Sequence, residues 1–168
     1  MPLIENIGHL RDPHLVRDGH ELRHLIEAMD HPMFGACWDI GHANHILSDQ
    51  SESLRVLGSL LKGLHVQDNL GDPDPKNWPW PMDMHTFPLF GNTNFDGVLQ
   101  TLLDIGYEGY FTFETDTPKP QRTRPPFIKD GVKIDRLSKI FPELRRHSLV
   151  FLHETGRLML EAYDCYEE

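Results

Sequence analysis

Residues 35–42 read GACWDIGH, a short apolar run that ends in Asp39 and is followed by a turn with a glycine. An apolar run of this length is typical of a buried strand, which we place at 34–38. Three further runs have the same form, and each has one acidic or imidazole side chain near its end: PLIEN with Glu5, GLHVQD with His65 and GYFTFET with Glu114. The repeated unit is therefore a strand followed by a candidate metal ligand.

Amphipathic helical patterns follow these runs. Ser48 and Asp49 supply the starting residues of one helix, which carries Leu60 and Leu61 on its apolar face and ends at Gly63. We expect the other helices at 19–29, 95–105, 134–141 and 142–163.

The alternation of strands and helices predicts an α/β fold in which parallel strands are joined by right-handed crossovers. We expect a single domain over 1–168, with four strand-helix units and long loops at 69–94 and 116–131. Four strands cannot close a barrel, but eight can. In such a barrel the functional residues lie at the C-terminal ends of the strands, where this sequence has its carboxylates and histidines.

Charge and composition exclude several classes of protein. The formal net charge of −10 is opposite to that of most nucleic-acid-binding surfaces, so we expect no nucleic-acid partner. The two cysteines have neither disulfide-framework nor zinc-finger spacing. No basic leader and no apolar stretch of about 20 residues is present. These features predict a soluble, cytoplasmic protein that does not enter a membrane.

One imidazole and three carboxylates at the ends of successive strands suit a divalent cation. The oxygen-rich set favours Mn or Mg, and the histidine also admits Co or Zn. A single glutamate at a strand end is often a salt-bridge or capping residue. Four candidates at the same topological position are harder to explain in that way, so we expect a metal site.

The segments IEN, WDIGH, LHVQDN, DMH and GYEGYFTFET, in this order, resemble the second half of the xylose isomerase-like TIM barrels. That superfamily includes sugar and sugar-phosphate isomerases and epimerases, inosose dehydratases and the endonuclease IV enzymes. The resemblance extends from about residue 3 to about residue 160. It implies that the chain forms the C-terminal half of a TIM-type (β/α)8 barrel.

The resemblance also implies roles for individual residues. Metal ligands would be the side chains at the ends of the four runs, namely Glu5, Asp39, His65 and Glu114. Glu5 and Glu114 would also be the catalytic acid and base that exchange a proton at a carbon of a sugar or polyol substrate. His42 resembles a histidine that contacts the substrate, although a turn histidine bonded to the backbone is an alternative.

Asp68, Asp83 and His85 have two interpretations. In endonuclease IV-like members a similar D-x-H pattern binds additional metal ions, whereas in other relatives it accompanies a single ion. Here these residues would bind a further metal, orient His65 or order the long loop. Asp68 would alternatively cap the end of its strand.

The sequence departs from the family pattern because the first four strand-helix units are missing. A lone half-barrel exposes sheet edges, so we expect either a homodimer or a missing N-terminal half. Two other functions stay open: an endonuclease IV-like AP endonuclease, and a non-catalytic half-barrel that serves as a binding or assembly module. Lys119, Arg122 and Arg124 would bind a phosphate or form a solvated basic loop.

Overall fold

The computed structural model describes residues 1–7, 16–71, 84–118 and 127–166. Contacts within the chain divide it into two compact units, 1–116 and 117–168. The first unit contains the sheet and all the expected metal ligands. The expectation of one domain over 1–168 stays a prediction.

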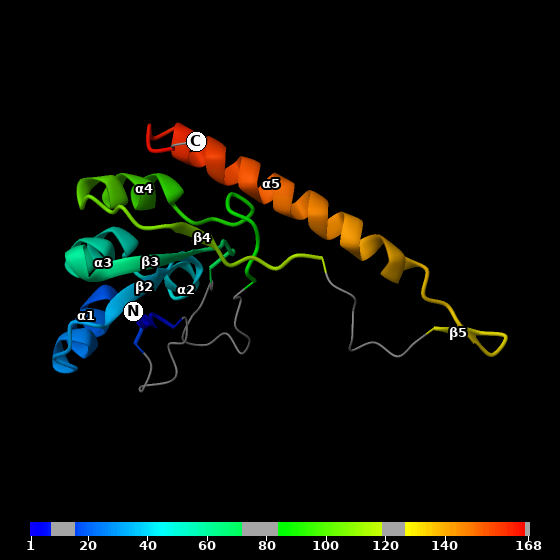
Figure 1. The fold of residues 1–168 in the computed structure, drawn as a ribbon, viewed down its shortest axis with the longest axis horizontal. Coiled ribbons are helices and arrows are strands. Elements are labelled where there is room, and N and C mark those ends of the chain that lie inside the picture. Colours follow the sequence, from blue (N-terminus) through cyan, green and yellow to red (C-terminus); the bar gives the residue numbers. More distant parts are fainter. Residues whose placement is uncertain (8–15, 72–83, 119–126, 167–168) are drawn as a thin grey trace. The chain divides into compact units, whose positions relative to one another are not determined.

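A parallel four-stranded sheet organises the first unit (Figure 1). Its strands, in spatial order, are β1 (Leu3–Glu5), β2 (Gly35–Asp39), β3 (Leu61–Val66) and β4 (Phe111–Phe113). Spatial order equals chain order, as right-handed crossovers between neighbouring strands require. The register places Glu5 beside Cys37 and Asp39 beside His65, so the strands end at nearly the same level.

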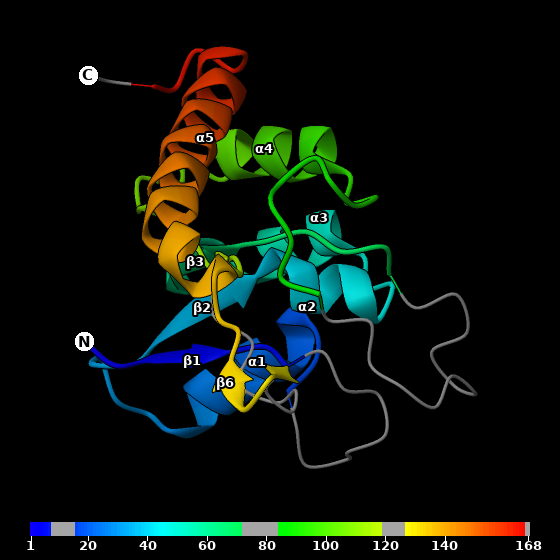
Figure 2. The same ribbon diagram turned by 90° about the vertical axis from the view of Figure 1, so that its right-hand side faces the viewer.

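In the described part of this unit the strands are connected by four helices: α1 (Gly19–Ala28), α2 (Ile40–His45), α3 (Gln50–Leu57) and α4 (Phe95–Asp104). Three of them, α1, α3 and α4, lie side by side (Figures 1 and 2). Their starts follow from capping chemistry, since the side chains of Asp18, Asp49 and Asn94 accept backbone N–H groups of the first turns.

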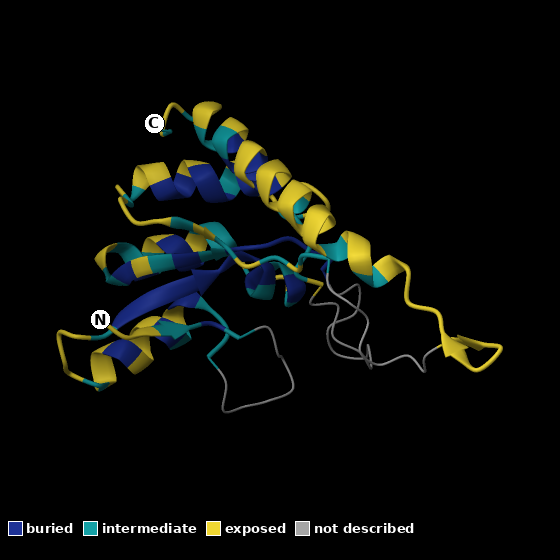
Figure 3. Ribbon diagram, turned by 45° about the vertical axis from the view of Figure 1, so that its right-hand side comes forward, coloured by how far each residue is buried: buried dark blue, intermediate teal, exposed yellow. Residues whose placement is uncertain are grey.

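The core of the unit lies between the sheet and these helices. Strand β2 is buried at every position, and the burial colouring shows it dark blue while the outward helix faces are yellow (Figure 3). The apolar side chains with at most 1% exposure include Trp38, Ala36, Leu64, Val66, Leu22, Leu54 and Leu57. Burial of each large apolar side chain contributes about 1.5–3 kcal/mol to folding. This packing fixes the strands whose ends carry the candidate ligands.

The predicted end of the helix after Asp49 was wrong. Helix α3 ends at Leu57, and Gly58 follows with φ of +48°, a left-handed conformation that glycine adopts readily. Leu60 closes a short 3-10 turn, and Leu61 begins β3 rather than ending the helix. The error arose because Leu60 and Leu61 fit both the apolar face of a helix that contains Leu57 and the start of a buried strand.

The second unit was predicted only in part. The expected loop 116–131 contains one strand of a hairpin, in which β5 (Ile128–Lys129) pairs with β6 (Val132–Lys133). Asp130 and Gly131 both have positive φ, as a two-residue hairpin turn requires.

The two helices expected at 134–141 and 142–163 correspond to a 3-10 turn (Leu137–Ile140) and to α5 (Phe141–Glu161). Across the described residues, every helix is too short or too polar to cross a membrane.

Candidate metal centre

The four candidate ligands lie at one edge of the sheet. Glu5 and Asp39 are the last residues of β1 and β2, and His65 is the last but one of β3. Glu114 follows β4 directly, and its N–H donates to the carbonyl of Val66 at 3.1 Å, which continues the ladder by one residue. The parallel arrangement therefore brings together side chains that are far apart in the sequence.

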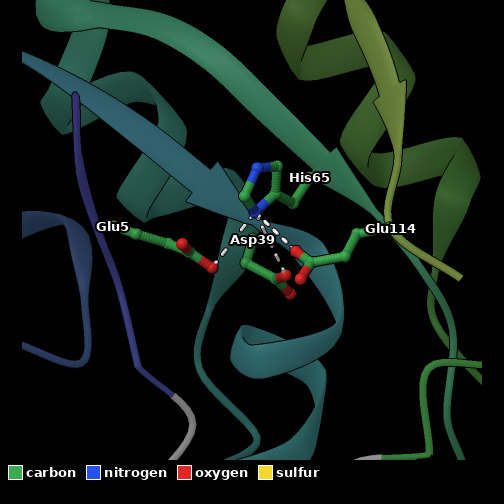
Figure 4. A group of neighbouring side chains, drawn as sticks. All are labelled: Glu5, Asp39, His65 and Glu114. Carbon is green, nitrogen blue, oxygen red and sulfur yellow. Dashed lines mark ion pairs between the residues drawn. The ribbon is translucent and has the colours of Figure 1, made fainter. Parts of the chain in front are cut away.

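The ligand atoms of these side chains all lie within 4.8 Å of one another. The Nδ1 atom of His65 lies 2.6 Å from Oε2 of Glu114, 3.2 Å from Oε1 of Glu5 and 3.9 Å from Oδ2 of Asp39 (Figure 4). The figure shows the three carboxylates pointing toward this nitrogen from different strands. The predicted set is thus brought together around one point.

The donor set fits a divalent cation. Nδ1 of His65 is buried, and its partners in the described part of the chain are the three carboxylate oxygens within 3.9 Å. Three carboxylates around one imidazole repel one another and the lone pair of a neutral imidazole unless a positive charge lies between them. A cation would accept the lone pair of Nδ1 and offset the charges of three carboxylates. One nitrogen and several oxygens suit Mn, Mg, Co or Zn.

Asp39 is the most enclosed of the ligands, with a side chain that is 0% exposed. The side chain of Asn6 binds both the N–H and the carbonyl of Asp39, at 2.7 and 3.0 Å. Its carboxylate accepts the backbone N–H of His42 at 2.6 Å and the amide of Gln67 at 3.3 Å. Burial raises the pKa of Asp39 to about 6, and the charge and N–H of His42 offset only part of this increase.

Glu5 has a different electrostatic environment. Burial raises its pKa, but hydrogen bonds and charge from His42 and His65 outweigh burial, so the pKa is below the ordinary value of glutamate. Its side chain is 28% exposed and lies 3.3 Å from Nδ1 of His42. Glu5 is therefore more easily ionised than Asp39, although both face the same point.

Two histidines border the cluster. Nδ1 of His42 lies 2.9 Å from the carbonyl of Asn6, and Nδ1 of His85 lies 3.0 Å from the carbonyl of Glu114. The two rings meet edge to face, with centroids 5.9 Å apart. His42 thus has the backbone contact expected of a turn histidine and also lies next to the cluster. Its contact with a substrate, and the role of His85, stay predictions.

Asp68 is buried and binds the segment that leads into α4. Its carboxylate accepts the backbone N–H groups of Asn69, Gly91 and Thr93 at 2.9, 2.8 and 3.2 Å. These contacts support a role in ordering the loop. A role as a ligand of an additional metal stays a prediction, and Asp83 lies outside the described residues.

Asn6 and Gln67 are site residues that the sequence analysis missed. Both are polar, 0% exposed and hydrogen-bonded to Asp39. A signal was present, because Asn6 directly follows Glu5, and Gln67 is two positions after His65. In extended chain, residues two positions apart point to the same side.

Comparison with known proteins gives the family. The family model of the xylose isomerase-like TIM barrels matches residues 2–138. The chain belongs to this family, which confirms the resemblance seen in the sequence and the expected half-barrel α/β fold.

Solved structures of epimerases share this fold. A D-psicose 3-epimerase determined with D-fructose is 15% identical and has a TM-score of 0.61, with 94% of this chain and 48% of that chain covered. The D-psicose 3-epimerase of Clostridium cellulolyticum H10, determined with D-tagatose, is 18% identical and has a TM-score of 0.59, with 90% and 48% covered. At these identities the likeness shows the fold alone.

A curated relative is the uncharacterised protein MJ1311 of Methanocaldococcus jannaschii. It is 29% identical over 125 residues, which cover 73% of this chain and 36% of the relative. The present chain therefore spans about half of the similar structures, and about a third of this relative.

Proposed function

We propose that the protein is a divalent-metal-dependent isomerase or epimerase that acts on a sugar or sugar phosphate by proton transfer next to a carbonyl. The observation that carries the proposal is the convergence of three carboxylates on the buried Nδ1 of His65. The family and the fold shared with sugar epimerases support it. A bound ion would polarise the carbonyl and make the neighbouring C–H more acidic.

Glu5 and Glu114 are suited to move the proton. They come from β1 and β4, the two outer strands of the sheet, and approach the cluster from opposite sides (Figure 4). Their side chains are 28% and 45% exposed, whereas Asp39 is fully buried. Epimerisation requires one group to remove a proton and another to return it on the opposite face. Both glutamates therefore combine metal binding with access to a substrate.

The test is exchange of the substrate C–H proton with deuterium, followed by NMR for a panel of ketoses and ketose phosphates with Mn²⁺. Glu114→Gln should abolish exchange at saturating Mn²⁺, because an amide does not take up the proton. Glu108→Gln, an equal charge change at an exposed position before β4, should leave exchange unchanged. Full exchange in Glu114→Gln would overturn the assignment of Glu114.

The sheet requires a further part to enclose a substrate. Among the described strands, β1 and β4 each pair on one side only. Because exposed edges favour association, we propose that a second copy of the chain or a separate N-terminal half covers them. Light scattering on the metal-loaded protein separates these cases. A mass of two chains supports the homodimer, and a mass of one chain contradicts it.

The two alternative functions have direct tests. Cleavage of a duplex containing an abasic site would favour an AP endonuclease, for which Asp83 and His85 were candidates. Stoichiometric metal binding without exchange on any ketose would favour a non-catalytic binding module.

A further inference from the structure

The two carboxylate oxygens of Asp39 have different surroundings. Oδ1 accepts the backbone N–H of His42 at 2.6 Å and the side-chain amide of Gln67 at 3.3 Å. Oδ2 faces the cluster, 3.9 Å from Nδ1 of His65 and 3.7 Å from Nδ1 of His42, and accepts the same amide at 3.5 Å. The short bond from the His42 N–H therefore holds Oδ1, while Oδ2 has only longer contacts with protein donors and is the oxygen turned toward the cluster.

Gln67 is well placed to hold the Asp39 carboxylate in this orientation, because its amide contacts both oxygens. It directly follows β3 and is 0% exposed, as is the carboxylate that it contacts. Since a buried donor beside a buried carboxylate gains little from moving away, the amide holds the carboxylate plane in one orientation. The backbone of Asp39 is independently fixed by Asn6.

Gly41 makes room for this amide. A Cβ atom at position 41 would overlap both Cδ and Oε1 of the Gln67 side chain. The backbone of Gly41 is also held, because its carbonyl accepts the Asn69 amide at 2.8 Å. Because the backbone at position 41 is held in place, a side chain there would have to displace the side chain of Gln67.

We propose that Gln67 is a positioning residue that makes Asp39 bind the cation through Oδ2 alone. Gly41 has no side chain and so leaves the space that the Gln67 amide needs. The inference rests on the proposed function, because it concerns the same metal centre. A single oxygen from Asp39 keeps the number of protein ligands low and leaves positions for substrate oxygens. It favours small six-coordinate ions such as Mn²⁺ over Ca²⁺, which takes 6–8 oxygens and often chelates carboxylates through both.

The test is the affinity of the folded protein for Mn²⁺ and Ca²⁺, each measured alone by calorimetry. Gln67→Met keeps the length of the side chain and removes its N–H donors. It should weaken Mn²⁺ binding by roughly 10- to 100-fold, as is typical when a partner of a metal ligand is lost. Because Asp39 gains rotational freedom, Ca²⁺ binding should weaken less, so the preference for Mn²⁺ falls.

Gly41→Ala tests the same inference without removing the amide, and should lower the preference for Mn²⁺ in the same direction. The matched control is Thr101→Val on α4, which removes a buried hydroxyl that bonds to Ser51 and Gly97. It should destabilise the fold and leave the ratio of the two affinities unchanged. Circular dichroism in EDTA establishes that each variant is folded before binding is measured.

The outcomes separate the inference from the proposed function. Wild-type affinities for both ions in Gln67→Met, in a protein that still exchanges substrate protons, overturn the inference alone. If Gln67→Met does not fold, an unchanged affinity ratio in Gly41→Ala has the same meaning. A wild-type protein that binds neither ion overturns the inference and the metal-dependent function together.

Discussion

The side-chain amide of Asn6 forms two hydrogen bonds with the backbone of Asp39: Oδ1 accepts the N–H at 2.7 Å, and Nδ2 donates to the carbonyl at 3.0 Å. The carbonyl of Asn6 also lies 2.9 Å from Nδ1 of His42. One residue thus links the end of β1 to the end of β2 and to the turn beyond it. Asn6 extends the contact between β1 and β2 beyond Glu5 and Cys37, the last residue pair of their ladder.

Asn6→Ala should lower the free energy of unfolding by about 2–3 kcal/mol, because it leaves the buried N–H and carbonyl of Asp39 without partners. Urea denaturation in EDTA measures this loss without a contribution from metal. Asn94→Ala, which removes an exposed helix cap, is the comparison and should cost about 1 kcal/mol. An equal or smaller loss in Asn6→Ala would show that the two bonds add little stability.

Metal affinity should depend on pH through Asp39. Burial raises the pKa of this carboxyl to about 6, so the metal-free fold holds the neutral acid below that pH. A cation binds the carboxylate, so binding must release the proton. The affinity for Mn²⁺ should fall at least about tenfold per pH unit below about pH 6.

The raised pKa has the opposite effect on the metal-free protein. The contribution of Asp39 to its stability is fully present below the unfolded pKa of 3.8 and is lost as the pH rises through about 6.

Mn²⁺ titrations between about pH 5 and pH 8 check the effect of pH on metal binding, and an affinity independent of pH would contradict it.

Removal of metal should destabilise the first unit. At an ion concentration about 100 times the Kd, binding to the folded state alone adds about 2.7 kcal/mol. For a chain of this size the midpoint of thermal unfolding should rise by roughly 5–10 °C. Differential scanning fluorimetry with EDTA and then excess Mn²⁺ measures the change. Asp39→Asn is the control, and a similar rise in that variant would indicate binding elsewhere.

The two cysteines should differ in reactivity. Cys37 is 5% exposed on β2, and burial together with the charges of Glu5 and Asp39 raises its pKa to about 12. Cys165 is exposed. Burial and the charge of Asp164 also raise the pKa of Cys165, but its thiol is accessible, so a thiol reagent at about pH 8 should modify Cys165 first and Cys37 only after denaturation. Rapid modification of a Cys165→Ser variant would show that Cys37 is accessible in the folded protein.

Much of the fold was predictable from local patterns. Short apolar runs gave the four strands of the sheet, and Asp49 and Asn94 marked helix starts because their side chains satisfy the first backbone N–H groups. The end of α3 was not predictable in this way. Leu60 and Leu61 are compatible with either element, and the left-handed turn at Gly58 decided between them.

The candidate site was predictable to the extent that parallel strands place their ends together. His65 and Glu114 could be selected because each lies near the C-terminal end of its apolar run. Parallel strands bring residues at these ends together at one edge of the sheet. The roles of Asn6 and Gln67 depend on contacts between residues 28 or more positions apart. Their positions beside Glu5 and His65 indicate only that they lie near the site, and the partners they bind follow from the three-dimensional arrangement.

The register that places Asp39 opposite His65 would make metal binding a check on the alignment of β2 and β3. A slip of one residue between β2 and β3 would turn His65 toward the helices and bring an apolar neighbour, Leu64 or Val66, to the cluster. A compact chain with that misalignment would lack the nitrogen ligand and bind the ion weakly. Metal uptake during refolding would therefore report correct strand alignment, which compaction alone does not distinguish.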